Sequence, residues 1–407
     1  MKQLLVKNIG MLATPEGKDA RRGADQGQIR LLPDAYVLMT DGRITEVGTG
    51  DKTVPGAEVL DAGGALVTPG LVDAHTHLIF GGWRQNELGL KLHGASYLDI
   101  LSMGGGILST VNATRAATEN ELYDKAKEAL DEMLSLGITT VEAKSGYGLD
   151  MDTELKQLRV IRRLNEEHPM DLVPTFLGAH AVPKEYKEDR AGYIRLLCEE
   201  VIPAVAREGL AEFCDVFCET GVFSAEESKA ILEAGKKWGL IPKIHADEID
   251  PIGGSQLTAQ VGAISAEHLI VCPPEGIAAM AKAGTVACCL PATSFYLGST
   301  FAPVRDMVNA GVPVAMATDF NPGSCPSLNM QFVINLGCLK YRLTPEEVLT
   351  AVTLNAAAAI NRADSIGSLE PGKLGDLVIW NAPDLNYICY RMGSNLVKTV
   401  IKKGHIL

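Results

Sequence analysis

The sequence predicts an α/β protein with a (β/α)8 TIM-like barrel in the middle of the chain and a small β-sandwich domain formed by both termini. Segments at both ends alternate apolar and polar residues, as strands with one buried face do. Between them, apolar segments alternate with amphipathic helical segments, which favours a parallel sheet. Eight such units in about 250 residues are typical of a closed barrel. We therefore expect the β-sandwich at residues 1–66 and 363–407 and the barrel at 67–362.

Strand signals dominate the two ends. "QLLVKNIGML" and "AYVLMTDGRITEVG" alternate apolar and polar residues, and Asp41-Gly42 and Gly63-Gly64 mark tight turns. "LGDLVIWNA" and "NLVKTVIKKGHIL" repeat the alternation near the other end, without helical periodicity. One β domain built from both termini is the simplest arrangement of these segments.

The middle of the chain has a different rhythm. Strand candidates lie at residues 66–75, 137–146, 171–180, 214–221, 241–248, 263–270, 285–291 and 312–320. Segments 119–136, 153–165 and 224–239 place apolar residues on one helical face. Ser224 and Glu227 predict a capping box at the start of the last helix. A doubly wound sheet would show similar alternation, but no GxGxxG follows the early strands.

Composition narrows the partners and the compartment. The 407 residues include 37 basic and 50 acidic ones, a net charge of -13, which argues against a general nucleic-acid or anionic-membrane binder. The first residues lack the pattern of a signal peptide, and no run of about 18 apolar residues occurs. Nine cysteines without CxxC spacing indicate free thiols in a reducing compartment. We expect a cytoplasmic enzyme that acts on a small molecule.

Histidines gather where strands are expected to end. His75 and His77 are separated by one residue, so both side chains project from the same face of a strand. His180, His245 and His268 close three later strand candidates, so five of the eight histidines lie at such positions. Each of them alone would be explained as an ordinary core or surface imidazole. Together they favour a site at the carboxyl ends of the strands, where barrels build their active sites.

The same face offers a metal site. His75, His77 and His245, together with Asp319 from the eighth strand candidate, form a set that leaves one position open for water. A metal ion bound there lowers the pKa of that water towards neutrality. Glu248 is a candidate proton shuttle, and its alternative interpretation is a solvated residue at a strand end. His268 would orient the water or polarise the attacked carbonyl.

Several motifs resemble a known family. "GLVDAHTH", "KIHADE", "SAEHL" and "ATDFNPGS" are similar to the amidohydrolase superfamily. "HTHLIFGGWRQNE", "EAKSGYGLD", "TFLGAHAVPKEY" and "KIHADEIDPIGG" resemble, more narrowly, the imidazolonepropionase family of histidine catabolism. The resemblance covers nearly the whole chain. It implies hydrolysis of 4-imidazolone-5-propanoate to N-formimidoyl-L-glutamate, one Zn²⁺ or Fe³⁺ ion per subunit, and a homodimer.

The resemblance also implies roles for particular residues. The metal ligands are His75, His77, His245 and Asp319, and the candidate acid–base residues are Glu248, His268 and Asp319. Arg84 would bind the propionate carboxylate with its planar guanidinium. The remaining implied substrate contacts are Tyr97, Tyr147, His180, Glu248, Asn321, Gly323 and Ser324. The resemblance leaves open which of Glu248, His268 and Asp319 accepts the first proton.

Two further features qualify this site. Some relatives place a modified lysine between two metals at the end of the fourth strand, but "CDVFCETG" has no lysine there. We therefore expect a single metal and interpret Lys144 as a charge partner inside the barrel. Gly104–Gly106 form either a ligand-contacting flap or a plain loop before a helix.

Two other functions fit parts of the pattern. A purine or pyrimidine deaminase of the same superfamily would show a similar metal set, although Arg84 and Tyr147 favour a substrate that carries a carboxylate. A catalytically inactive binding protein on the same barrel would typically have lost metal ligands, and none of the four is missing here.

Overall fold

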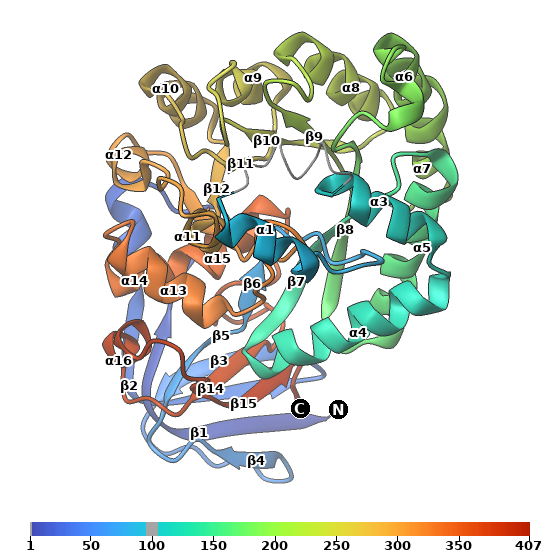
Figure 1. Cartoon of the computed structure of the whole chain (residues 1–407). Helices are drawn as coiled ribbons and strands as arrows, with labels where there is room; N and C mark the ends of the chain where they lie inside the picture. The colour runs from blue at the N-terminus through green and yellow to red at the C-terminus, as the bar shows by residue number, and fades with distance from the viewer. Residues whose placement is uncertain (1, 95–104) are drawn as a thin grey trace.

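The computed structural model describes residues 2–94 and 105–407, which form a barrel above a curled sheet (Figure 1). The barrel strands are hydrogen-bonded in sequence order and are parallel throughout. They are β6 (Leu71–Asp73), β7 (Ile138–Lys144), β8 (Asp171–Ala179), β9 (Phe213–Cys218), β10 (Ile241–Ala246), β11 (Ser265–His268), β12 (Val286–Cys289) and β13 (Val314–Met316). The predicted barrel is confirmed.

The barrel closes just beyond the ends of its first and last strands. Thr76 and Phe320 form a parallel bridge there. The backbone N–H of His77 donates to the carbonyl of Phe320 at 2.9 Å, and that of Asp319 donates to the carbonyl of His75 at 3.0 Å. This seam fixes the two segments that carry the predicted ligands His75, His77 and Asp319.

The segment expected as one strand at 66–75 divides between two sheets. β5 (Leu66–Pro69) pairs with strands of the terminal domain, and β6 belongs to the barrel. Gly70 stands between them, and a Cβ at this position would lie 2.3 Å from Oγ1 of Thr139. Only glycine lets the chain pass this closely from one sheet to the other.

Helices surround the barrel on its outside (Figure 1). They are α4 (Glu119–Ser135), α5 (Met151–Glu167), α6 (Arg190–Leu196), α7 (Ile202–Glu208), α8 (Ala225–Lys237), α9 (Gly254–Val261), α10 (Pro274–Ala283), α11 (Pro291–Leu297), α12 (Val304–Asn309), α13 (Met330–Leu339), α14 (Pro345–Ala351) and α15 (Leu354–Ala359). The predicted capping box of α8 is present, with Ser224 accepting from the backbone of Glu227. Short helices α1 (Leu88–Leu92) and α3 (Ile107–Ala116) follow β6. No helix in the described ranges is long and apolar enough to span a membrane.

Both termini contribute to one small β domain, as predicted. Its strands form a single curled sheet in the order β16-β15-β14-β5-β1-β2-β3, with β4 also paired to β1. They are β1 (Gln3–Thr14), β2 (Arg30–Thr40), β3 (Arg43–Thr49), β4 (Glu58–Asp61), β14 (Leu377–Trp380), β15 (Val397–Lys402) and β16 (His405–Ile406), and α16 (Leu385–Tyr390) lies between β14 and β15. Apolar side chains such as Val6, Val37 and Ile401 form one buried cluster in this domain.

The terminal sheet is fastened to the amino ends of the barrel strands. Lys402 on β15 is 3% exposed, and its Nζ donates to Asp376 at 2.6 Å and to Asp171, the first residue of β8, at 2.8 Å. Trp380 on β14 packs with the barrel core and donates to Oγ1 of Thr68 at 2.9 Å. The carboxyl ends of the barrel strands point the other way, away from this domain (Figure 1).

Candidate metal centre and active site

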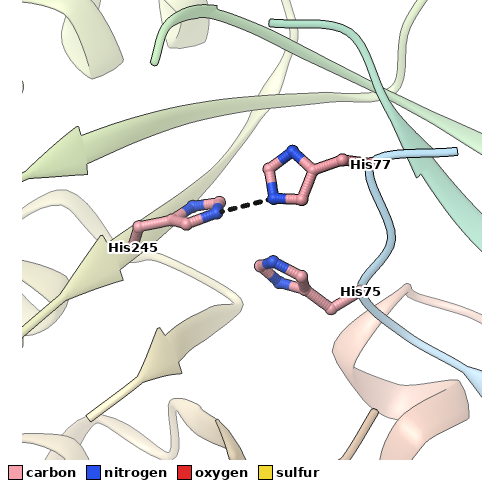
Figure 2. A group of neighbouring side chains, drawn as sticks. All are labelled: His75, His77 and His245. Atoms are coloured by element: carbon pink, nitrogen blue, oxygen red, sulfur yellow. Dashed lines mark hydrogen bonds between the residues drawn. The ribbon is translucent and has the colours of Figure 1, made fainter. Parts of the chain in front are cut away.

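The four predicted metal ligands converge at the carboxyl ends of the barrel strands. His75 and His77 follow β6, His245 lies on β10 and Asp319 follows β13. Figure 2 shows the three imidazoles turned towards one another. Nε2 of His77 lies 3.4 Å from Nε2 of His245, and Oδ1 of Asp319 lies 3.4 Å from Nε2 of His75 and 3.5 Å from Nε2 of His77.

Their donor atoms fit a bound metal ion. Nε2 of His75 and Oδ1 of Asp319 are buried and have no hydrogen-bond partner in the described part of the chain. Two ligands that each lie about 2.1 Å from one tetrahedral ion are about 3.4 Å apart, close to the observed separations. Burial lowers the pKa values of His75 and His77 well below the ordinary value, so both imidazoles are neutral and keep a lone pair for a metal.

Asp319 and His268 adopt backbone conformations that are unusual for their residue types. Their φ angles are 56° and 70°, in the left-handed region that disfavours L side chains. Oγ1 of Thr293 donates to Oδ2 of Asp319 at 2.6 Å, so that Oδ1 is left to face the histidines. Such strain is maintained at sites where a side chain must point in one direction.

Two of the three candidate proton carriers, Glu248 and His268, lie beside the predicted ligands. Nε2 of His268 is 3.5 Å from Oε2 of Glu248, and the His268 ring centroid is 5.2 Å from that of His245. Burial, with the charges of Asp319 and Glu219, raises the pKa of Glu248 to about 8. A carboxyl group with a pKa near neutrality can accept and return a proton at working pH.

His180 and Tyr147 form one wall of the site. The His180 ring stacks on His77 with centroids 4.8 Å apart and an interplanar angle of 14°. Its Nδ1 lies 3.0 Å from the carbonyl of Gly146, which makes Nδ1 the donor and leaves Nε2 as an acceptor. Burial lowers the pKa of His180 to about 3, so the ring is neutral. The Tyr147 ring is buried, 5.3 Å from that of His180.

Arg84 reaches the loop that follows Asp319. Its guanidinium lies so close to Gly323 that a Cβ there would stand 1.7 Å from Nη2. Nε of Arg84 is 3.4 Å from Oε2 of the buried Glu87, which also accepts the backbone N–H of Gly106 at 2.7 Å. Gly106 immediately precedes α3, which is compatible with both interpretations of this segment; Gly104 lies outside the described residues.

Asn321 and Ser324 shape their own loop. The side-chain Oδ1 of Asn321 accepts the backbone N–H of Gly323 at 2.8 Å and of Ser324 at 2.7 Å, and its Nδ2 donates to the backbone carbonyl of Asp319 at 2.7 Å. These bonds fix the shape of the loop that lies against Arg84. The contact of Asn321, Gly323 and Ser324 with substrate stays a prediction. Tyr97 lies outside the described residues.

Sequence reasoning missed two carboxylates that contact the ligands from below. Oε2 of Glu267 lies 2.8 Å from Nδ1 of His75, and Oδ2 of Asp215 lies 3.0 Å from Nδ1 of His245. The available signal was a single acidic residue inside each of the apolar segments "CDVFC" and "SAEHL". The interpretation of Lys144 as a buried charge partner is confirmed, because its Nζ lies 2.6 Å from Glu142 and 2.9 Å from Asp215.

Comparison with known proteins decides the family. The profile of the amidohydrolase family matches residues 66–407. An imidazolonepropionase of Alkaliphilus metalliredigens (strain QYMF) is 53% identical over 414 residues, covering 100% of this chain and 98% of that protein. The chain belongs to the imidazolonepropionase family. The family member of Geobacillus kaustophilus (strain HTA426) is 49% identical over 416 residues, covering 100% of this chain and 98% of that protein.

Solved structures share the fold of this imidazolonepropionase family member at low identity. A triazine hydrolase variant has a TM-score of 0.75 and 18% identity, covering 100% of this chain and 95% of that one. An atrazine chlorohydrolase of Arthrobacter aurescens TC1, complexed with zinc, has a TM-score of 0.73 and 18% identity, covering 99% and 95%. These structures support the barrel fold. Family membership makes the chain a metal-dependent hydrolase, and its histidine-rich centre suits a divalent ion.

Proposed function

We propose that the chain opens the cyclic amide of 4-imidazolone-5-propanoate by adding water, giving N-formimidoyl-L-glutamate in histidine degradation. The observation that carries this proposal is the convergence of His75, His77, His245 and Asp319 in a chain 53% identical to an imidazolonepropionase over its full length. Two of the converging atoms, Nε2 of His75 and Oδ1 of Asp319, have no hydrogen-bond partner among the described residues. A small-molecule substrate follows from the same relationship.

We assign one zinc or iron ion to His75, His77, His245 and Asp319. Bound there, the ion would act as a Lewis acid towards the ring carbonyl and make a water molecule acidic enough to attack near neutral pH. Neutral imidazoles and one carboxylate are the ligand types that such ions prefer. The orphaned Nε2 of His75 and Oδ1 of Asp319 support this assignment.

Glu248 would take the proton from the attacking water and return it to the ring nitrogen as the C–N bond breaks. Its pKa of about 8 suits both transfers. His268, 3.5 Å from Glu248, would hold that carboxylate in place. Asp319 is the remaining candidate for the first proton, but we prefer Glu248 because Asp319 also faces two histidines as a ligand.

Three groups would hold the substrate. Arg84 would bind the propionate carboxylate. Its guanidinium packs against Gly323, so the loop that contains Gly323 orients the guanidinium plane. His180 would accept a ring N–H at Nε2, because its Nδ1–H is used by Gly146. Tyr147, beside His180, would pack against the ring. Asn321, Gly323 and Ser324 would contribute polar groups from the loop.

We further propose that the enzyme is a cytoplasmic homodimer. All nine cysteines are free, as expected in a reducing compartment. The dimer rests on the family resemblance. Gel filtration with light scattering would measure twice the chain's 43.4 kDa if the dimer forms and the chain mass if it does not.

Turnover of imidazolonepropionate by Arg84→Ala tests the substrate assignment. Loss of a charged hydrogen-bonding partner is worth about 1.5–3 kcal/mol, so KM should rise roughly 10- to 100-fold. Arg391→Ala, on the surface of α16's end, serves as the control and should leave KM unchanged. If the wild-type protein does not turn over imidazolonepropionate but releases ammonia from guanine or cytosine, it is instead a deaminase.

A further inference from the structure

Beneath the metal-binding histidines, the barrel interior holds five charged side chains. They are Glu142, Lys144, Asp215, Lys243 and Glu267, and each is 0% exposed. Moving a single charge into a protein interior costs several kcal/mol unless it is paired. Five buried charges at one place therefore require compensating contacts, and the contacts within the cluster indicate its role.

One arm of the cluster leads to His245. Oδ2 of Asp215 lies 3.0 Å from Nδ1 of His245 and 2.9 Å from Nζ of Lys144. The Lys144 ammonium continues to Oε1 of Glu142 at 2.6 Å. Although burial opposes its charge, Asp215 and Glu142 hold the pKa of Lys144 above its usual range, so it remains an ammonium.

A second arm leads to His75. Oε2 of Glu267 lies 2.8 Å from Nδ1 of His75, and its Oε1 lies 3.3 Å from Nζ of Lys243. Lys243 also approaches Oε1 of Glu142 at 3.8 Å. The two arms therefore meet at Glu142 and alternate in charge along their whole length.

Each arm fixes one ligand through the ring nitrogen that faces away from the metal site. A carboxylate beside Nδ1 keeps the proton on that nitrogen and directs the Nε2 lone pair into the site. Nε2 of His75 faces Asp319, and Nε2 of His245 faces His77, as this requires. Each carboxylate is held in place by a buried lysine, with Nζ of Lys144 2.9 Å from Asp215 and Nζ of Lys243 3.3 Å from Glu267.

We propose that Lys144 and Lys243 are positioning residues that act through Asp215 and Glu267 to orient His245 and His75, and that they thereby set the affinity for the metal ion. The inference rests on the proposed ligation by His75, His77, His245 and Asp319. Neither lysine touches the substrate or the ion. Their effect is on the angle and tautomer of the two imidazoles.

The experiment measures the Zn²⁺ dissociation constant by competition with a chromophoric chelator. Wild type is compared with Lys144→Met, Lys243→Met and His245→Ala, with folding checked by circular dichroism. Losing a partner behind a ligand weakens metal binding by roughly 10- to 100-fold, and we expect this in both lysine variants. Lys402→Met removes another buried lysine, at the other end of the barrel, and should leave the dissociation constant unchanged.

Two isosteric variants keep the test decisive if a lysine variant fails to fold. Asp215→Asn and Glu267→Gln preserve volume but break the charge alternation in one arm each, and each should weaken Zn²⁺ binding by at least 10-fold. Absorption spectra of the Co²⁺-substituted variants should also differ from wild type, because the ligand geometry changes.

The outcomes separate the two proposals. His245→Ala that binds Zn²⁺ as tightly as wild type would overturn the ligand assignment. His245→Ala that loses Zn²⁺, while folded Asp215→Asn, Glu267→Gln and the lysine variants bind within twofold of wild type with an unchanged Co²⁺ spectrum, would overturn the positioning role alone.

Discussion

The two ends of the barrel differ in whether their buried polar groups have partners. At the carboxyl ends of the strands, Nε2 of His75 and Oδ1 of Asp319 are buried without a partner in the described residues. At the amino ends, the buried Lys402 bonds Asp376 and Asp171 within 2.8 Å. Unpaired polar atoms at one end and paired charges at the other indicate a ligand site and a structural junction, respectively.

The position of a cavity does not by itself locate the proposed active site. A cavity of about 450 Å³ opens beside Asp171 and Glu212 at the amino ends of the strands. Both carboxylates are already paired there, Asp171 with Lys402 and Glu212 with Arg362 at 2.5 Å. The proposed active site lies instead at the carboxyl ends of the strands, where barrels build their active sites.

Truncating a ligand should give the largest effect. We expect His245→Ala to lose at least about 10³-fold in kcat/KM, because a catalytic metal supplies several kcal/mol of transition-state stabilisation. Metal content measured by mass spectrometry should fall with it. His405→Ala, on the terminal strand β16, controls for loss of an imidazole and should keep both. A His245→Ala protein that keeps both its metal and full turnover would show that His245 is not a metal ligand.

Removing the buried charge at the opposite end should affect stability instead. Lys402→Met leaves Asp376 without its buried ammonium and should lower the free energy of unfolding by about 3 kcal/mol or more. The kcat of the folded fraction should not change. Lys403→Met is the matched control, because this neighbour also pairs with Asp171 but is 45% exposed, and it should cost less than about 1 kcal/mol. Equal losses in urea unfolding for the two variants would contradict the distinction.

The two ends should also respond to acid in different pH ranges. Burial lowers the pKa of His180 to about 3, and unfolded histidine titrates near about 6.5. As pH falls below about 6.5, His180 binds a proton in the unfolded chain but stays neutral in the folded protein. The metal-free protein therefore loses stability in this pH range. Although burial opposes it, Lys402 holds the pKa of Asp171 below its usual range, so the junction loses stability only below about pH 4.

Urea unfolding of the metal-free protein between pH 8 and pH 4 checks this order. His180→Gln should make stability depend less steeply on pH between 6.5 and 4. Asp171→Asn should lower stability by a nearly constant amount over the same range. A steep change in the Asp171→Asn difference near pH 6 would contradict the assignment of that range to the histidines.

Sequence patterns could predict that His75, His77, His245 and Asp319 come together, because these residues stand at strand ends, where a barrel brings distant segments together. They could not predict that Glu267 belongs to His75, because that contact crosses the barrel interior between β11 and the extension of β6, which are not neighbours in the sheet. They also could not divide residues 66–75 between two sheets, because the cause is a close approach of Gly70 to Thr139. Likewise, the loop-forming bonds of Asn321 follow from the turn itself and not from the spacing of residues.

The seam between Thr76 and Phe320 has a consequence for biosynthesis. Three of the four proposed ligands lie on the two segments that it joins, and these segments are the first and the last of the barrel to be translated. A nascent chain on the ribosome therefore has no complete centre until Phe320 has emerged from the exit tunnel. The complete set of four proposed ligands is consequently available only late in synthesis, after most of the barrel has been made.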